Sequence, residues 1–395
     1  MVRAGCGVHT PPFDTPRCSE MNDIGIIQAA MDQAVRDGVF PGGVLAGRLD
    51  GEIRILVVAG YLSSESAAQP VQPTTVYDLA SLTKPLATVT SVLLLVQAGK
   101  LKLDVAVGDV LVELKHAPIG VASVRDLLSH RSGLAGWRPL YERLDAEGCA
   151  WGRAEPSVVR QSVLRLIGKE SLVSQVGAQS LYSDLGFIVL GCAVERASGL
   201  SLDEYFYEAV ARPLGVNTLF FTRTRAASPQ SRLSRPDVII APTEWDDWRQ
   251  RILKGEVHDE NAAAMGGVAG HAGLFGTAES VLAVSGAWLA GYHGDRSILD
   301  PQLVREFTTK QSHPQPSSWA LGWDTPTAPS SSGTHFSPES FGHLGFTGTS
   351  LWIDPRRKLE VVLLTNRVHP SRSNDAIRAF RPLIHDLAYG VLTRA

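Results

Sequence analysis

Cysteine and clustered basic residues are scarce in this 395-residue chain. The four cysteines are Cys6, Cys18, Cys149 and Cys192, and they form no CxxC pair. Their spacing argues against a structural zinc site or a compact disulfide framework. Lysine and arginine are scattered and the formal net charge is −3, so we expect no electrostatic surface for nucleic acid or for an anionic membrane. No run reaches the roughly eighteen apolar residues that a membrane span needs.

Several catalytic motifs are also absent from the sequence. There is no GxSxG, which argues against an α/β-hydrolase, and neither a P-loop nor a dinucleotide fingerprint is present. HExxH is missing as well. The segment EVHDEN at 256–261, with His271 after it, matches no standard zinc spacing, so we expect a hydrogen-bonded loop beside a pocket rather than a metal site.

The amino-terminal segment 1–21 is rich in proline, threonine and charge, and it lacks the apolar centre of a signal peptide. We therefore expect a cytoplasmic protein with an irregular amino-terminal segment. A periplasmic lipoprotein is an alternative only if the true start lies upstream, because AGC at 4–6 would then end a lipoprotein signal.

The rest of the chain has the composition of a globular protein with a large core, at 44% hydrophobic and 19% charged residues. Apolar spacing predicts a helix over 22–38, and two apolar runs joined at Asp50-Gly51 predict a hairpin over 42–60. Residues 81–99 are too long and apolar for a strand and predict a buried helix, with Pro85 in its first turn. The other predicted elements are helices and loops over about 100–265, short strands at 341–346, 349–354 and 359–366, and a closing helix at about 373–391.

This order of elements predicts a mixed α/β (α+β) fold in which both ends of the chain build one sheet and a helical region is inserted between them. We expect a sheet domain from residues 22–80 plus 266–395 and a mainly helical domain from residues 81–265. The active site would lie at their junction.

The first candidate for chemistry is SLTK at 81–84, which opens the most apolar helix of the chain. Three residues apart on a helix, Ser81 and Lys84 face the same way and can touch. Serine is a poor nucleophile without a base, and burial would lower the pKa of Lys84 enough to make its neutral amine that base. The alternative is a helix-capping Ser81 with a solvated Lys84.

The second candidate is Tyr182-Ser183-Asp184, which precedes an apolar helix. A nearby ammonium would lower the pKa of Tyr182 and let the phenol relay protons to a leaving group. The alternative is a packing tyrosine beside a capping Ser183 or Asp184.

The third candidate is FGHLGFTGT at 341–349, where glycines crowd a predicted strand. Glycines in a strand often mark the close approach of another backbone or a ligand. The alternative is a bulged edge strand with a surface histidine at His343.

Taken together, these segments resemble the penicillin-recognising serine hydrolases, which include class C β-lactamases, DD-peptidases and β-lactamase-fold esterases. SxxK at 81–84, the YxN-like YSD at 182–184 and HxG at 343–345 come in the family's order. LLSHRSGL at 127–134 and GHAGLFGTA at 270–278 are similar to two further family segments. The resemblance covers roughly residues 25–392. It implies a β-lactamase/transpeptidase-like fold with an antiparallel sheet flanked by helices.

The resemblance also implies roles for single residues. Ser81 would attack the acyl carbon, and Lys84 and Tyr182 would share the proton transfers, with the first base left open between them. The backbone N–H groups of Ser81 and Phe346 would form the oxyanion hole. Gly345 and His343 would line the pocket on the sheet side. No cofactor is implied.

Two positions depart from the β-lactamase pattern and bear on the substrate. Asp184 stands where asparagine is usual, and His343 stands where lysine is usual. Both changes make the pocket less positive, whereas β-lactams and peptidoglycan peptides present a carboxylate. We therefore expect an esterase-like serine hydrolase that forms an acyl-enzyme with ester or amide bonds, with weak or no β-lactamase activity. Its substrate would be a small ester, an amide or a short peptide. The alternatives are a β-lactamase or D-alanyl-D-alanine carboxypeptidase, and a non-catalytic ligand-binding or sensor protein on the same fold.

Overall fold

The computed structural model describes residues 23–65, 67–149, 154–223 and 238–394. The irregular segment expected over 1–21, with two of the cysteines, lies outside these ranges, and the cytoplasmic location stays a prediction. The other two cysteines, Cys149 and Cys192, are free.

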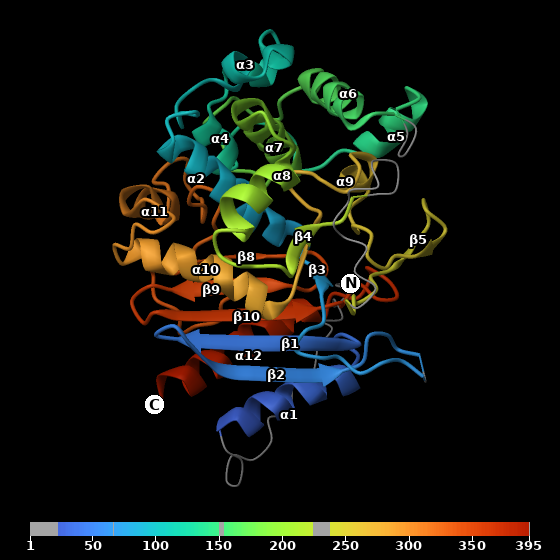
Figure 1. Ribbon diagram of the computed structural model, residues 1–395, viewed down its shortest axis with the longest axis vertical. Helices are drawn as coiled ribbons and strands as arrows, with labels where there is room; N and C mark the ends of the chain where they lie inside the picture. The colour runs from blue at the N-terminus through green and yellow to red at the C-terminus, as the bar shows by residue number, and fades with distance from the viewer. Residues whose placement is uncertain (1–22, 66, 150–153, 224–237, 395) are drawn as a thin grey trace, which may run out of the picture.

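A five-stranded antiparallel sheet lies across the lower half of the molecule and takes strands from both ends of the chain (Figure 1). Its order is β2-β1-β10-β9-β8. The strands are β1 (Gly42–Leu49), β2 (Glu52–Gly60), β8 (Phe341–Leu344), β9 (Ser350–Asp354) and β10 (Leu359–Thr365). Asp50 and Gly51 join β1 to β2 with φ of 49° and 85°. The predicted hairpin and the sheet shared by the two ends are confirmed.

Both faces of this sheet are covered, which is why its central strands β1 and β10 are mostly apolar. Helices α1 (Asp23–Arg36) and α12 (Ile377–Thr393) pack on one face, over a core that includes Leu45 and Leu363. The neighbouring Val44 and Leu364 point to the other face, which α10 (Ala278–Tyr292) and the helical region cover.

The helical region forms the upper half of the molecule in Figure 1. Its helices are α2 (Thr90–Gln97), α3 (Val107–Val110), α4 (Val124–Leu128), α5 (Leu140–Ala146), α6 (Pro156–Gly168), α7 (Asp184–Ser198), α8 (Leu202–Phe206) and α9 (Glu260–Ala264), and α11 (Pro301–Thr308) lies beside them. One apolar core runs continuously from the sheet into this region. The division into residues 22–80 plus 266–395 and residues 81–265 stays a prediction.

Two small sheets complete the architecture. One consists of β3 (Tyr77–Asp78), β7 (Leu274–Gly276) and β4 (Leu219–Phe221), in the order β3-β7-β4. The other is the hairpin of β5 (Trp245–Asp246) and β6 (Arg251–Ile252). Strand β3 matters most for the site, because it leads directly into the segment that carries Ser81.

The buried helix predicted over 81–99 is less regular than expected. A 3₁₀ turn over Ala80–Leu82 is followed by a π-helical stretch over Lys84–Val89 and only then by α2. Pro85 lies at the start of the π-helical stretch, where its missing N–H breaks no helical bond. Such π-helical turns are frequent at functional sites.

In the described ranges one helical segment is long and apolar enough for a membrane span, and one bent helix pair is so only when its two helices are counted together. The first is Ala80–Gln97, which is 78% buried inside the protein. The second is the pair Asp184–Ser198 and Leu202–Ala211, which bends by 71°. The burial of Ala80–Gln97 is that of a core helix.

Candidate active site

Ser81 lies at the tip of the core helix, and the residue before it is held in an unusual conformation. Ala80 has a φ of 47°, a region that costs a residue with a side chain about 1–2 kcal/mol. The buried carboxylate of Asp78 accepts the Ala80 backbone N–H at 2.8 Å and the His258 N–H at 2.7 Å. Ser81 itself is partly exposed. The turn therefore presents the hydroxyl at an accessible helix start, as the sequence predicted.

Lys84 is fully buried behind Ser81 and contacts three acceptors. Its Nζ lies 3.0 Å from Ser81 Oγ, 3.2 Å from the His271 carbonyl oxygen and 2.6 Å from Asp184 Oδ1. The predicted contact between Ser81 and Lys84 is present, and the alternative of a solvated lysine is wrong.

The expectation that burial lowers the pKa of Lys84 enough to give a neutral amine is also wrong. Burial lowers this pKa, as the sequence analysis assumed, but the charge of Asp184 and the contacts with Tyr182 more than offset that effect. The pKa of Lys84 is therefore raised above its ordinary value, and the resting side chain is an ammonium. The sequence indicates that Asp184 belongs to the pocket, but no local pattern places its carboxylate beside Lys84.

Tyr182 meets the same pair from the helical side. The Lys84 Nζ lies 4.8 Å from the Tyr182 ring centroid. Loss of solvation raises the pKa of Tyr182 and outweighs the opposite effects of Lys84 and of the hydrogen bonds with Lys84 and Ser81. The expected lowering by a nearby ammonium is present, but burial outweighs it, so the pKa is raised overall and Tyr182 rests as a neutral phenol. The capping alternative is correct only for Ser183, whose hydroxyl accepts the Gly186 N–H at the start of α7.

His130 is a buried residue of this site to which the sequence analysis gave no role. Its Nδ1 accepts the Ser183 backbone N–H at 3.1 Å, and its ring centroid lies 4.7 Å from that of Tyr182 and 4.4 Å from that of Trp319. Burial, followed by the charge of Lys84, lowers its pKa well below the ordinary value, so the ring is neutral. His130 thus holds Tyr182 in place. The segment LLSHRSGL was its sequence signal.

Strand β8 forms the other side of the site. His343 is buried, its Nδ1 lies 2.7 Å from the Leu344 carbonyl oxygen, and burial lowers its pKa to about 3. The surface-histidine alternative is wrong, and the expected neutral side chain is confirmed. A Cβ at Gly345 would lie 2.5 Å from the Leu79 carbonyl oxygen, so the predicted close backbone approach is real.

Phe346 follows Gly345 and is the exposed part of this side. Its side chain is 48% exposed, the Arg367 guanidinium carbon lies 4.4 Å from its ring centroid, and the His258 ring lies 5.5 Å away. The Phe346 carbonyl accepts from Arg367 Nε at 2.8 Å, which fixes the turn. The oxyanion role of the Phe346 and Ser81 N–H groups stays a prediction.

Among Trp245, Trp248 and Trp319, the last contacts the site residues named above. Trp319 packs against Tyr182 and His343, with ring centroids 5.4 Å and 5.5 Å away. Trp245 is exposed on β5, and Trp248 packs on Tyr141.

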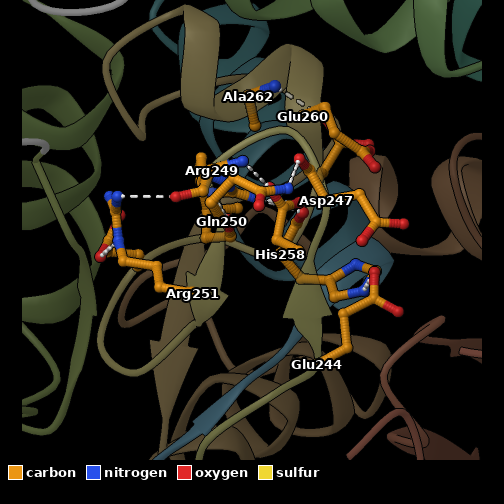
Figure 2. Close-up of polar contacts among 12 residues, drawn as sticks. Glu244, Asp247, Arg249, Gln250, Arg251, His258, Glu260 and Ala262 are labelled. Carbon is orange, nitrogen blue, oxygen red and sulfur yellow. Dashed lines mark hydrogen bonds and ion pairs between the residues drawn. The ribbon is translucent and has the colours of Figure 1, made fainter. Parts of the chain in front are cut away.

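The segment 244–262 is a polar network beside the site rather than a metal centre. Figure 2 shows the His258 ring against Glu244, and their Nε2 and Oε1 atoms lie 2.9 Å apart. Glu244, Asp246 and Glu260 offer oxygens within 4.8 Å of one another. Arginine side chains already pair with these carboxylates: Arg249 with Asp246, and Arg372 with the other two. The expectation of a hydrogen-bonded loop therefore fits this segment.

The same segment reaches Lys84 through a second histidine–carboxylate pair. His271 Nε2 lies 2.7 Å from Asp259 Oδ1, and its carbonyl oxygen is the one that Lys84 contacts. The charge and hydrogen bond of His271 hold the pKa of Asp259 well below its ordinary value, although burial alone would raise it. Asp259 also accepts the Ala262 N–H at the start of α9.

A model of the Beta-lactamase family matches residues 27–384 of this chain. The chain belongs to the beta-lactamase family. A relative from Escherichia coli K12, named "Putative D-alanyl-D-alanine carboxypeptidase", is 32% identical over 330 residues, which are 78% of this chain and 73% of the relative. A relative of the same name from Salmonella agona is 31% identical over 341 residues, covering 80% of this chain and 76% of the relative.

Solved structures share the fold of this beta-lactamase-family chain. EstCE1, a hydrolase with promiscuous acyltransferase activity, has a TM-score of 0.71 at 23% identity and covers 92% of this chain and 97% of its own. The octameric penicillin-binding protein homologue from Pyrococcus abyssi has a TM-score of 0.71 at 22% identity, covering 93% and 78%. The predicted β-lactamase/transpeptidase-like fold is confirmed, and the protein is a serine hydrolase of that fold.

Proposed function

We propose that this serine hydrolase cleaves esters, or amides that lack a carboxylate beside the scissile bond, with little turnover of β-lactams. The observation that carries the proposal is the charge of the pocket. Asp184 neutralises the buried Lys84 ammonium at 2.6 Å, and His343 adds an uncharged ring on the strand side. A substrate carboxylate would lose its hydration here and find no compensating charge in either group.

Two arginines that contact the turn after β8 are already bonded to its backbone. Arg381 donates to the carbonyl oxygens of Gly345 and Thr349, and Arg367 donates to that of Phe346. These bonds hold the guanidinium groups in the wall of the turn. This arrangement supports a pocket that recognises its substrate by shape and by hydrogen bonds from the backbone.

In the proposed reaction Ser81 Oγ attacks the acyl carbon and Lys84 with Tyr182 moves the protons. Tyr182, as a neutral phenol, would give its proton to the leaving group. The N–H groups of Ser81 and Phe346 would bind the developing oxyanion, and a helix start with free N–H groups favours that charge. Water would then hydrolyse the acyl-enzyme.

D-Alanyl-D-alanine carboxypeptidase activity is the second candidate. It is favoured by the names of the relatives at 31–32% identity, which cover more than two thirds of this chain. Such a substrate ends in the kind of carboxylate that the pocket charge disfavours, so the two candidates make opposite predictions.

A substrate panel distinguishes them. The purified protein is given p-nitrophenyl butyrate, a chromogenic cephalosporin and a peptide ending in D-alanyl-D-alanine, with Ser81→Ala as the matched control. We expect the ester to have the highest kcat/KM, and Ser81→Ala to lower it by at least about 10³-fold. Intact mass should show an acyl adduct in the wild type alone.

Preferred cleavage of the peptide or the cephalosporin would overturn the ester proposal in favour of the second candidate or a β-lactamase. Ligand binding without turnover, equal in the wild type and Ser81→Ala, would instead identify a non-catalytic sensor.

A further inference from the structure

We propose that Asp184 is a positioning residue for catalysis: it holds the Lys84 ammonium against Ser81 and accepts one ammonium proton when the amine is needed as a base. This inference rests on the proposed acyl-transfer chemistry at Ser81. The roles of Ser81, Lys84 and Tyr182 alone do not explain how a resting ammonium becomes a base. Asp184 supplies the group that takes the ammonium proton.

The position of Asp184 is rigidly determined. It is the first residue of α7, its backbone N–H donates to the Gly136 carbonyl at 2.8 Å, and the capping Ser183 precedes it. The positive end of a fifteen-residue helix favours a carboxylate at this point. Its Oδ1 is buried, and it lies 2.6 Å from the Lys84 Nζ.

Elimination among the acceptors of Lys84 leads to Asp184. Four groups surround the Lys84 Nζ: Ser81 Oγ, the His271 carbonyl, Asp184 Oδ1 and the Tyr182 phenol. The carbonyl is a neutral amide oxygen that does not hold a proton at ordinary pH. Ser81 is the nucleophile, whose proton must be removed. Tyr182 is a neutral phenol that already carries its proton, because burial raises its pKa. Asp184 is therefore the acceptor of the four that can store a proton.

The other titratable groups around the pair come from four separate segments and are uncharged or already paired. His130, after α4, and His343, on β8, both have pKa values lowered by burial and by Lys84, and Tyr182 has a raised pKa. From the α9 side, Asp259 is paired with His271. The carboxylate and the ammonium thus face each other among neutral neighbours, where a proton shift that removes both charges costs least.

The proton balance of the step is simple. One proton moves from Lys84 Nζ to an Asp184 oxygen, which leaves a neutral amine and a carboxylic acid. The amine takes the Ser81 proton as Oγ bonds to the acyl carbon and the carbonyl electrons move to the oxyanion. As the oxyanion collapses, the bond to the leaving group breaks and that group takes a proton through Tyr182, which Lys84 reprotonates. In deacylation the neutral Lys84 amine takes a proton from water as the water oxygen bonds to the acyl carbon, and Ser81 Oγ leaves and takes that proton back. Asp184 then returns its proton to Lys84, which restores the resting ion pair.

The test is the pH dependence of kcat/KM for p-nitrophenyl butyrate in Asp184→Asn, which keeps the shape and removes the charge. In the wild type the carboxylate accepts the ammonium proton, so the neutral amine forms without losing a proton to solvent. In Asp184→Asn no carboxylate accepts that proton, so the acid limb of the profile reports the loss of a proton from Lys84 to solvent. We expect the limb to rise by more than about one pH unit, with a loss of about tenfold or more at acidic pH that is recovered as the pH rises.

Asp184→Glu should keep the wild-type limb, because it keeps a carboxylate. Asp203→Asn is the matched control. It removes a partly buried ion pair between Asp203, which lies in α8, and Arg223, and it should leave the pH profile unchanged. If Asp184→Asn fails to fold, Asp184→Ser also removes the carboxylate, and its acid limb tests the same expectation.

A limb that stays in place or moves to lower pH in the variants without a carboxylate overturns the proposal, as does a uniform loss at every pH. These outcomes differ from failure of the proposed function, in which the wild type does not cleave the ester. The profile is then measured with the D-alanyl-D-alanine peptide, and a protein that turns over neither substrate overturns both proposals.

Discussion

The two sides of the Ser81 pocket differ in how they are built. On the helical side, Lys84 and Asp184 form a buried ion pair at 2.6 Å, and Tyr182 packs beside them. On the strand side, His343 is neutral and the turn after β8 contributes backbone and an exposed Phe346. The charge of the site is therefore confined to one side, where it is internally balanced. This arrangement suits proton transfer on the helical side and recognition by shape on the strand side.

The largest expected effect comes from disturbing the helical side. Tyr182→Phe keeps the ring contacts with His130 and Trp319 but removes the hydroxyl that would give its proton to the leaving group. We expect kcat/KM for p-nitrophenyl butyrate to fall by about 10²-fold or more. Esters with poorer leaving groups should lose more, because they depend more on protonation. An equal loss for all leaving groups would contradict the proton-relay role.

A charge added to the strand side should change the choice of substrate. His343→Lys introduces a cation where the wild type has a neutral ring, opposite Tyr182. We expect the ratio of kcat/KM for the D-alanyl-D-alanine peptide to that for the ester to rise by about tenfold, a typical effect of a charged hydrogen bond. His343→Gln, which adds no charge, is the matched control. A ratio that moves equally in both variants would show that the charge of residue 343 does not select the substrate.

The polar network of residues 244–262 should make the stability of the protein depend on pH. Glu244 has a pKa lowered to about 2 by His258 and Arg372, although burial opposes them. Because this pKa is below that of the unfolded chain, the carboxylate stabilises the fold above about pH 4.5 and loses that contribution as the pH falls toward 2.

Glu244→Gln should therefore lower the free energy of unfolding at neutral pH and flatten its decline in acid. Urea unfolding at several pH values measures both changes. Parallel curves for the variant and the wild type would show that Glu244 does not contribute to the acid dependence.

The smallest expected effect concerns the strained turn between the two sides. Ala80→Gly accommodates the φ of 47° without a side chain, and it also makes the unfolded chain more flexible. We expect the free energy of unfolding to rise by at most about 1 kcal/mol, and Ala80→Val to lower it. Thermal unfolding of both variants tests this order. A more stable Ala80→Val would show that the turn relaxes at little cost.

Much of this molecule followed from local sequence patterns. The hairpin at Asp50-Gly51, the three late strands and the closing helix were predicted because their signals lie within a few residues of one another. The contact of Ser81 with Lys84 was predictable for the same reason, since a helical turn brings the two side chains together. The order of the motifs indicated the family.

Only the tertiary structure decided the state of those side chains. Asp184 lies a hundred positions from Lys84 in the chain, and no local pattern reports that the two touch at 2.6 Å. The sequence predicted a lowered pKa for both Lys84 and Tyr182, and both pKa values are raised. Each pKa is a balance between burial and the charges of distant segments, and a local pattern does not report that balance. His130 gained its role in the same way, through a bond to Ser183. Sequence determined which groups enter the site, and long-range packing decided which of them are charged.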